Sequence, residues 1–300
     1  MVDCVISVVI PSYNYKRYLP QAVSSVAAQT YENLELVIVD DASKDGSAEE
    51  IKRLAKQYEC RFSGGVKTIF HSENSGAHAA INEGIARASG RLVAILNADD
   101  LYERDRFSLM TGKMENARFA FSAVRCIGED GARLDTAQAR AFESIQRHIA
   151  GKRFTALSAV AENVAVSTGN LLFEKTLYTE LGGFRNYKYV HDYDFFLRAC
   201  LRAEPAFIGE TAYLYRLHGE NSFTRLQKEG LRENRMVWLD VYAMVKRGDV
   251  QNPVMLDGDY RQEFYTAVCE AGKKKQALWR MAGNPAVSAG LALLKKRYGV

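Results

Sequence analysis

The sequence predicts an α/β protein with a mostly parallel sheet, helices on both faces of that sheet, and a helical C-terminal extension. Short, nearly continuous apolar runs alternate with helix-length segments through the first 118 residues. This pattern is typical of parallel strands that are buried on both faces. Polar and acidic residues directly follow three of these runs, and the pattern becomes helical from about residue 224.

The expected elements of the first half are separated by turn residues. The strands are rich in β-branched residues, and the second helix has a polar face. The expected strands are Val5–Ile10, Glu35–Val39, Lys67–Phe70 and Arg91–Leu96, and the expected helices are Leu19–Gln29, Ser47–Tyr58, Ala77–Ala88 and Asp105–Asn116.

The pattern is mixed after residue 118. Helices are expected at 138–150 and at His191–Leu201, with a turn at Gly182-Gly183 between them. The expected strands are Phe119–Ile127, Asn170–Phe173, Phe207–Ile208 and Tyr213–Leu217. We therefore expect one domain over residues 1–220 and a helical extension over residues 221–300.

Length and composition indicate a globular protein without a disulfide framework. The 300 residues, of which 47% are hydrophobic and 25% charged, suffice for one large α/β domain with appendages or for two small domains. The five cysteines are scattered and form no CxxC pair, which favours a reducing compartment. The run Val5–Ile10 has no basic leader, and no stretch reaches the roughly 18 apolar residues of a membrane span. We expect a cytoplasmic protein.

The net charge of +4 comes from the end of the chain. Residues 271–300 contain seven Lys or Arg and no Asp or Glu, whereas the rest has 33 basic and 36 acidic residues. Such a body lacks the broad basic surface of a nucleic-acid binder. The basic tail residues flank apolar ones, which predicts peripheral contact with an anionic membrane on its cytoplasmic face. These residues are Lys273–Lys275, Arg280 and Lys295–Arg297.

Polar residues gather where the expected strands end. Tyr13-Asn14, Asp40-Asp41 and Asn97–Asp100 each follow a strand, and ligands of parallel sheets bind at the carboxyl ends of the strands. Carboxylates there suit a hard divalent cation. Because no glycine-rich phosphate loop is present, we expect a metal at Asn97–Asp100 to bridge to a diphosphate.

Several motifs occur in one order along residues 5–222. They are Ile6–Asn14 (ISVVIPSYN), Asp40-Asp41, Asn74-x-Gly76, Asn82-x-Gly84, Leu96–Asp100 (LNADD), Leu181–Phe184 (LGGF), His191–Asp194 (HDYD) and Tyr215–His218 (YRLH). Together they resemble the family 2 glycosyltransferases, which are inverting enzymes of the GT-A fold. The resemblance implies that residues 1–220 form a catalytic domain that moves a sugar from a nucleotide-diphosphate sugar to an acceptor hydroxyl.

The resemblance also implies how the donor is held. Pro11, Tyr13 and Asp41 would line the nucleobase pocket, with Asp40 close by. The expected nucleotide-sugar-binding residues are Pro11, Tyr13, Asn14, Asp40, Asp41, Asn74, Asn97, Ala98, Asp99 and Arg216. UDP is the favoured nucleotide.

A DxD-like motif would hold the diphosphate. Asp99 would bind a divalent metal, Mn2+ or Mg2+, and Asn97 would lie near the ribose or diphosphate. Arg216 and His218 would close over the diphosphate. We further predict that His218 is a metal ligand paired with Asp99 across the donor diphosphate, because Asn97 brings no charge and imidazole suits manganese better than magnesium.

Asp192 is the expected general base, taking the acceptor proton in a single in-line displacement. Glu180–Phe184 and Ser167–Leu171 would border the acceptor, expected to be a glycan or lipid-linked glycan in surface-polysaccharide assembly. Three positions depart from the family pattern: Asn97 replaces the first Asp of the metal motif, Ile81 replaces a frequent basic residue, and His191 replaces the acidic residue before the base.

Two other functions share parts of this site. A nucleotidyltransferase that makes a nucleotide sugar would have the same sheet and metal, but it would normally need a glycine- and arginine-rich loop after the first strand. Residues Ser12–Leu19 contain no glycine. A non-catalytic nucleotide-sugar-binding protein with a decayed site is the other alternative, and the presence of Asp99, Asp192 and His218 argues against it.

Overall fold

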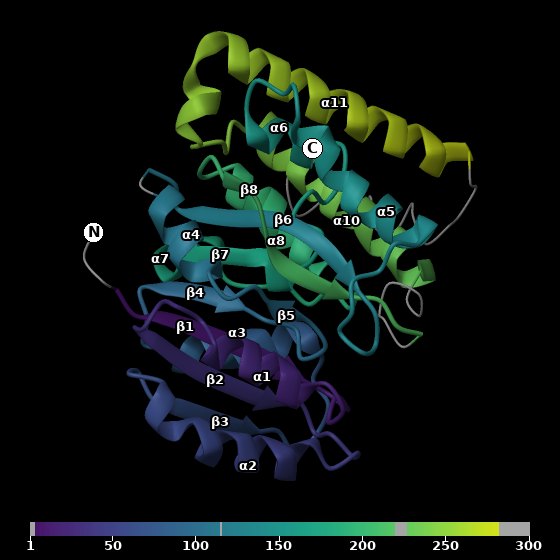
Figure 1. The fold of residues 1–300 in the computed structure, drawn as a ribbon. Coiled ribbons are helices and arrows are strands. Elements are labelled where there is room, and N and C mark those ends of the chain that lie inside the picture. The colour runs from purple at the N-terminus through teal and green to yellow at the C-terminus, as the bar shows by residue number, and fades with distance from the viewer. Residues whose placement is uncertain (1–3, 115, 220–226, 282–300) are drawn as a thin grey trace.

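A computed structural model describes residues 4–114, 116–219 and 227–281, with side chains as far as residue 271. The centre of the molecule is one eight-stranded sheet in the order β3-β2-β1-β4-β7-β6-β8-β5 (Figure 1). Its strands are β1 (Ile6–Ser12), β2 (Leu34–Asp40), β3 (Val66–Phe70), β4 (Leu92–Ile95), β5 (Leu101–Tyr102), β6 (Phe119–Ile127), β7 (Leu171–Glu174) and β8 (Ala206–Arg216).

Most neighbouring strands of the sheet are parallel. β1 pairs in parallel with β2 and β4, β2 with β3, and β6 with β8. β7 runs antiparallel to both β4 and β6, and β5 runs antiparallel to β8. The sheet is therefore mixed but mostly parallel, which confirms the predicted fold class.

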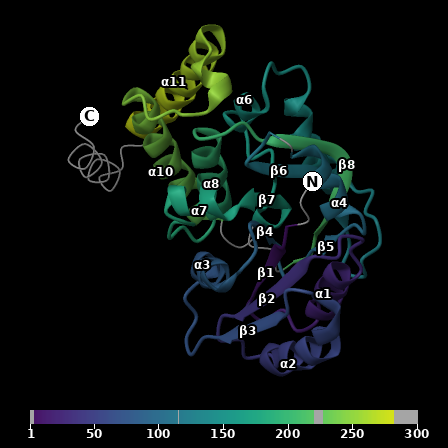
Figure 2. The same cartoon turned by 90° about the vertical axis from the view of Figure 1, so that its left-hand side faces the viewer.

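Helices cover both faces of the sheet. Figure 2 shows α3, α7 and α8 on one side and α1, α2 and α4 on the other. The helices of the first half are α1 (Leu19–Ala27), α2 (Ser47–Tyr58), the 3-10 turn η1 (Glu59–Arg61), α3 (Ala77–Arg87) and α4 (Arg106–Lys113). Those of the second half are α5 (Ala137–Ser144), η2 (Ile145–Ile149), α6 (Thr155–Ala159), η3 (Thr168–Asn170), α7 (Lys175–Leu181) and α8 (His191–Cys200).

Two hydrophobic cores follow from the alternation of side chains along the strands. On β1, Val9 packs into the core beneath α3 and α8, whereas Val8 and Ile10 pack into the core beneath α1, α2 and α4. The strands are consequently apolar on both faces, and this is why their sequences are nearly continuous apolar runs.

The C-terminal part is helical, as predicted. It consists of α10 (Gln227–Lys246), the 3-10 turn η4 (Pro253–Leu256) and α11 (Gly258–Met281), and α10 and α11 pack against each other (Figure 1). Val237, Trp238 and Val241 of α10 are buried in the same core as α8. Expected membrane-contacting residues Lys273–Lys275, Arg280 and Lys295–Arg297 lie outside the described side chains, so that surface stays a prediction. Among the described residues, none of the helices is long and apolar enough to cross a membrane.

The structure differs from the expected elements at three places. The two expected strands near 207 and 214 form one strand, β8. Its polar middle, which separated them in the sequence pattern, lies at an irregularity in the pairing with β6 between Ser122 and Val124. The expected helix at 138–150 divides into α5 and η2. Three short elements, β5, α6 and α7, have too few residues to show a hydrophobic period and were not expected.

Gly84 lets α3 approach the sheet closely. A Cβ at this position would lie 2.4 Å from Cγ1 of Val9 and 3.2 Å from Cγ2 of Val39. We expect Gly84→Ala to lower the free energy of unfolding by about 1–3 kcal/mol, because the added methyl overpacks the contact. Urea unfolding measures the change.

Gly112 in α4 provides the matched control, since nothing lies within 4 Å of a Cβ built there. Gly112→Ala should be neutral or stabilising by up to about 1 kcal/mol. Equal stability of Gly84→Ala and the wild type would show that α3 does not sit against β1 and β2 in this way.

Candidate active site

The polar strand ends meet at one edge of the sheet. β1, β2 and β4 are adjacent and parallel, with Ser12 opposite Asp40 and Val9 opposite Ile95. Tyr13, Asp41 and the segment Asn97–Asp100 therefore leave the sheet at the same edge. This agrees with the sequence-based expectation of one site at the carboxyl ends of the strands.

Asp41 organises the loop that leads to α3. Its buried carboxylate accepts the backbone N–H groups of Ser75 and Gly76 at 2.9 and 2.8 Å, and it lies 2.7 Å from Nδ1 of His71. Asn74 makes a longer bond, 3.4 Å, to the Asp41 carbonyl. His71 was not predicted, although it directly follows β3 and so stands at a fourth strand end.

Asn14 joins two loops at this edge. It has a positive φ of 59°, a conformation that Asn tolerates better than most residues. Its backbone N–H donates to Ser43 Oγ at 2.8 Å, and its side-chain carbonyl accepts from the Lys44 N–H at 2.8 Å. These bonds give Asn14 a bracing role beside the expected donor site, and its direct contact with a ligand stays a prediction.

Residues expected near the nucleobase differ in accessibility. Tyr13 is 43% exposed, whereas Asp40 is buried. Asp40 Oδ2 accepts the Ser43 N–H at 3.0 Å, and Oδ1 has no hydrogen-bond partner within the described part of the chain. Ala98 and Ile81 are both 1% exposed. Ala98 and Ile81 both pack in the hydrophobic cores.

Asp100 is the most buried acid of the metal motif. It is 1% exposed, and its carboxylate accepts bonds from the Asn97 amide at 3.0 Å, from the Arg216 N–H at 2.7 Å, and from the Tyr213 hydroxyl. Burial first, and the neighbouring charge of Asp99 second, raise the pKa of Asp100 well above its usual value, against the effect of these donors. Asp100 therefore acts as an internal brace of the motif.

Asp99 and His218 lie side by side and contact each other directly, and their predicted role as metal ligands stays a prediction. Nε2 of His218 is 2.9 Å from Oδ2 of Asp99, and the imidazole packs against the rings of Tyr15 and Tyr18. Two adjacent ligands of an octahedral cation, each at about 2.0–2.1 Å, stand about 2.9 Å apart. In this structure the two atoms are hydrogen-bonded, and the same spacing is compatible with two ligands of one divalent ion.

The protein offers few metal ligands beyond this pair. Within the described residues, three or more His, Cys, Asp or Glu side chains do not gather as a metal-binding group. Sites of this kind leave the remaining positions to substrate phosphates and water. The donor set therefore suits a cation that binds together with a diphosphate, and the metal itself remains a prediction.

Arg216 is placed differently from what the resemblance implies. Its fully buried guanidinium donates to the carbonyls of Asp99, Gly128 and Glu129 at 2.6–2.9 Å, and to the side chain of Gln21 at 2.7 Å. The guanidinium ties the metal motif to the loop after β6. Closure of this side chain over a diphosphate would require it to leave these acceptors.

Asp192 lies in the first turn of α8, where its carboxylate is half-buried. Oδ1 accepts the Tyr193 N–H at 2.7 Å, and Oδ2 accepts the Asn163 amide at 2.8 Å. Burial raises the pKa of Asp192 to about 6, which suits a base that works near neutral pH. Burial also lowers the pKa of the adjacent His191 to about 4, so the imidazole is neutral at pH 7.

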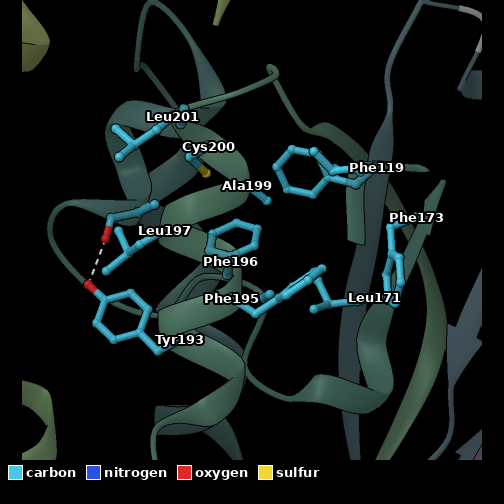
Figure 3. Close-up of a cluster of buried hydrophobic side chains, with 14 of the residues drawn as sticks. Phe119, Leu171, Phe173, Tyr193, Phe195, Phe196, Leu197, Ala199, Cys200 and Leu201 are labelled. Carbon is cyan, nitrogen blue, oxygen red and sulfur yellow. Dashed lines mark hydrogen bonds between the residues drawn. The ribbon is translucent and has the colours of Figure 1, made fainter. Parts of the chain in front are cut away.

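The helix that carries Asp192 is anchored by aromatic packing. Figure 3 shows Phe195 and Phe196 of α8 directed at Phe119, Leu171 and Phe173 of the sheet. Ring centroids are 5.0 Å apart for Phe195 and Phe173, and 5.8 Å apart for Phe196 and Phe119. This packing holds α8, and with it Asp192, against β6 and β7.

The C-terminal extension secures the approach to α8. Glu233 of α10 accepts the backbone N–H groups of Lys188, Tyr189 and Val190 at 2.9, 2.8 and 3.3 Å. Because Val190 directly precedes α8, the extension helps to position the candidate base. Local sequence gave no indication of this contact, which joins residues 43 to 45 positions apart.

One segment joins the candidate base to the metal motif. Asn163 holds Asp192, Ser167 Oγ accepts the Asn97 amide at 2.9 Å, and Thr168 Oγ1 lies 3.2 Å from Nε2 of His191. Val166, between them, has a φ of +71°, which is strained for a β-branched residue. Ser167–Leu171 was expected to border an acceptor, but the role of Asn163 was not foreseen.

Similarity to known proteins agrees with this geometry. The sequence model of Glycosyl transferase family 2 matches residues 7–180. The putative teichuronic acid biosynthesis glycosyltransferase TuaG of Bacillus subtilis is 35% identical over 132 residues, which are 43% of this chain and 50% of TuaG. An uncharacterised glycosyltransferase of Nostoc sp. is 46% identical over 98 residues, 33% of this chain and 29% of that protein. The chain thus spans half or less of the length of these two relatives.

Solved structures show the same fold. The structure of S. aureus TarS 1-349 in complex with UDP-GlcNAc matches with a TM-score of 0.61 at 15% sequence identity. The match covers 89% of this chain and 72% of the TarS chain. The mannosyltransferase PcManGT from Pyrobaculum calidifontis in complex with GDP-Man and Mn2+ has a TM-score of 0.57 at 18% identity and covers 97% of this chain and 79% of its own. This structural similarity confirms the predicted GT-A fold.

Proposed function

Since the chain belongs to glycosyl transferase family 2, we propose that it is an inverting, metal-dependent enzyme that transfers a sugar from a nucleotide-diphosphate sugar to an acceptor hydroxyl. The observation that supports this best is the pairing of two different groups at one sheet edge. Asp99 and His218 lie 2.9 Å apart. Asp192, whose burial raises its pKa to about 6, is joined to the metal motif through the segment 163–168.

The proposed reaction is a single displacement at the anomeric carbon. Asp192 accepts the proton of the acceptor hydroxyl as the hydroxyl oxygen bonds to that carbon, and the bond to the diphosphate breaks. Asp99 and His218 would hold a divalent cation, which when bound neutralises the charge that develops on the leaving diphosphate. Attack from the side opposite the leaving group inverts the configuration.

The donor and acceptor are proposed by class. UDP-sugars are favoured because TarS was solved with UDP-GlcNAc. TuaG is described as a putative teichuronic acid biosynthesis enzyme, and this supports an acceptor in surface polysaccharide, either a glycan or a lipid-linked glycan. Manganese is the favoured cation, because imidazole prefers softer metals and PcManGT was solved with Mn2+. We propose a cytoplasmic location, with the basic tail as a membrane contact.

A non-catalytic nucleotide-sugar-binding protein is the alternative that most needs a direct test. It would bind donor and cation without consuming the donor. Incubation with a panel of nucleotide sugars, including UDP-GlcNAc and GDP-mannose, with and without manganese, separates the two functions. Consumption of a donor excludes the binding protein. Binding of a donor that is not consumed, even when a panel of acceptor glycosides is added, excludes the enzyme.

Replacing the candidate base tests the chemistry. Asp192→Asn keeps the size of the side chain but cannot accept a proton, so turnover should fall roughly 100- to 10,000-fold while donor affinity stays nearly unchanged. Only the ionised carboxylate is a base, so wild-type activity should decline as the pH falls through about 6. Initial rates over that pH range, with donor binding by calorimetry, measure both effects.

Asp135→Asn is the control, because that side chain is 82% exposed. It should retain both the wild-type rate and the wild-type pH dependence. Full activity in Asp192→Asn would remove this residue from the mechanism.

The metal assignment predicts a second effect. His218→Ala should raise the manganese concentration for half-maximal activity by at least about tenfold, because one of two protein ligands is lost. His148→Ala, whose side chain is 50% exposed, is the matched control and should leave the manganese titration unchanged. Titrations of activity against Mn2+ decide this, and a wild-type titration curve in His218→Ala would return His218 to an ordinary loop residue.

A further inference from the structure

The side-chain amide of Asn163 has two ends in different environments. Its nitrogen donates to Oδ2 of Asp192 at 2.8 Å. Because a carboxylate accepts hydrogen bonds, the NH2 group must face Asp192, and the amide oxygen must face away from it. That oxygen, Oδ1, is buried and has no hydrogen-bond partner among the described residues.

A buried amide oxygen without a donor is costly, and most such atoms in proteins are paired. This atom belongs to the same amide as the nitrogen that contacts the candidate base. The natural donor at such a position is a neutral hydroxyl, which can give its hydrogen without adding charge next to Asp192. An acceptor sugar has hydroxyl groups on neighbouring carbons, so one can face Asp192 while the next faces Asn163.

The backbone around Asn163 is held in place. Its carbonyl accepts the Val166 N–H at 2.9 Å, which closes a tight turn. Val166 is strained, and Ser167 is bonded to Asn97 at 2.9 Å. The amide of Asn163 is therefore fixed relative to both Asp192 and the metal motif, which is what a positioning residue requires.

From this geometry we propose that Asn163 positions the two reacting partners: its N–H fixes the Asp192 carboxylate, and its carbonyl oxygen binds a hydroxyl of the acceptor sugar beside the reacting one. This rests on the proposed function. Asn163 is then an acceptor-binding residue as well as a support for the base.

The effect of removing the Asn163 amide on the pKa of Asp192 depends on the ionisable groups around that carboxyl. They are Asp194, Tyr189, Tyr193 and Tyr215. Asp194 is acidic and disfavours ionisation of Asp192, whereas the donors from Asn163 and Tyr193 favour it. Removing the Asn163 donor must therefore raise the pKa of Asp192 further.

Two substitutions separate the two ends of the amide. Asn163→Ala removes both, whereas Asn163→Asp keeps an oxygen for the acceptor and loses the donor to Asp192. Glu162→Gln is the matched control, because this neighbouring side chain is 49% exposed. The substrates are the nucleotide sugar and the methyl glycoside that the wild type uses best in a panel.

In Asn163→Ala, the acid limb, which is the pH at which the rate falls on the acid side, should rise by about one unit. This is the shift expected from losing a hydrogen bond to a charged group. The substitution should also raise KM for the methyl glycoside about 3- to 10-fold, with donor affinity unchanged. Asn163→Asp should move the limb further, because two carboxylates meet, yet keep KM near the wild-type value above the limb. Glu162→Gln should match the wild type. An unshifted limb and unchanged KM in Asn163→Ala would overturn the proposal.

A readout independent of turnover distinguishes failure of this inference from failure of the proposed function. The folded-state pKa of Asp192, about 6, exceeds the unfolded value of about 3.9. The wild type should therefore lose stability relative to Asp192→Asn as the pH rises towards 6, and lose no more above it. With Asn163→Ala in both proteins, the loss should continue to higher pH.

Each result has one meaning. If the wild type consumes no nucleotide sugar, the proposed function fails, and the pH window of this stability difference still decides whether Asn163 holds Asp192. An unchanged window overturns the inference even if the enzyme is active. If Asn163→Ala does not fold, Asn163→Asp, which preserves the side-chain shape, gives the same decision.

Discussion

A buried carboxylate must find donors, and the one on Asp100 finds them on elements that are far apart in the chain. The Asn97 amide comes from its own loop, while the Tyr213 hydroxyl and the Arg216 N–H come from β8, more than 110 residues later. Leaving any of these unpaired would cost more than an ordinary hydrogen bond contributes. Burial of Asp100 therefore fixes the end of β8 against the end of β4. His218, two residues beyond Arg216, then lies next to Asp99.

The other half of the site depends on packing more than on polar contacts. α8 is held by Phe195 and Phe196 against the sheet, and Glu233 of α10 binds the backbone just before it. The segment from Asn163 to Thr168 then joins the two halves, contacting Asp192 at one end and Asn97 at the other. An enzyme of this kind needs base and leaving-group site at a set distance. Here a short and strained segment supplies that constraint.

The parts predicted correctly from sequence are those whose signal is local. Strands β1, β2 and β4 are apolar runs, and polar residues follow them closely in the sequence, so Asp41, Asn97 and Asp99 could be assigned to one edge of the sheet. Tyr213 and Asn163 could not be foreseen, because their partners lie 113 and 29 residues away. The resemblance implied a donor contact for Arg216, and nothing in the sequence indicated that its guanidinium would bind the carbonyls of Asp99, Gly128 and Glu129.

We propose that this bracing makes Asp99 and His218 a cation-binding pair for the donor diphosphate. Anomalous diffraction from crystals grown with Mn2+ and UDP tests it most directly, because it locates the metal independently of activity. We expect a single manganese peak at the strand ends, bonded to the Asp99 carboxylate, to Nε2 of His218 and to diphosphate oxygens. A peak bound by other side chains, or an imidazole turned away from the metal, would contradict it.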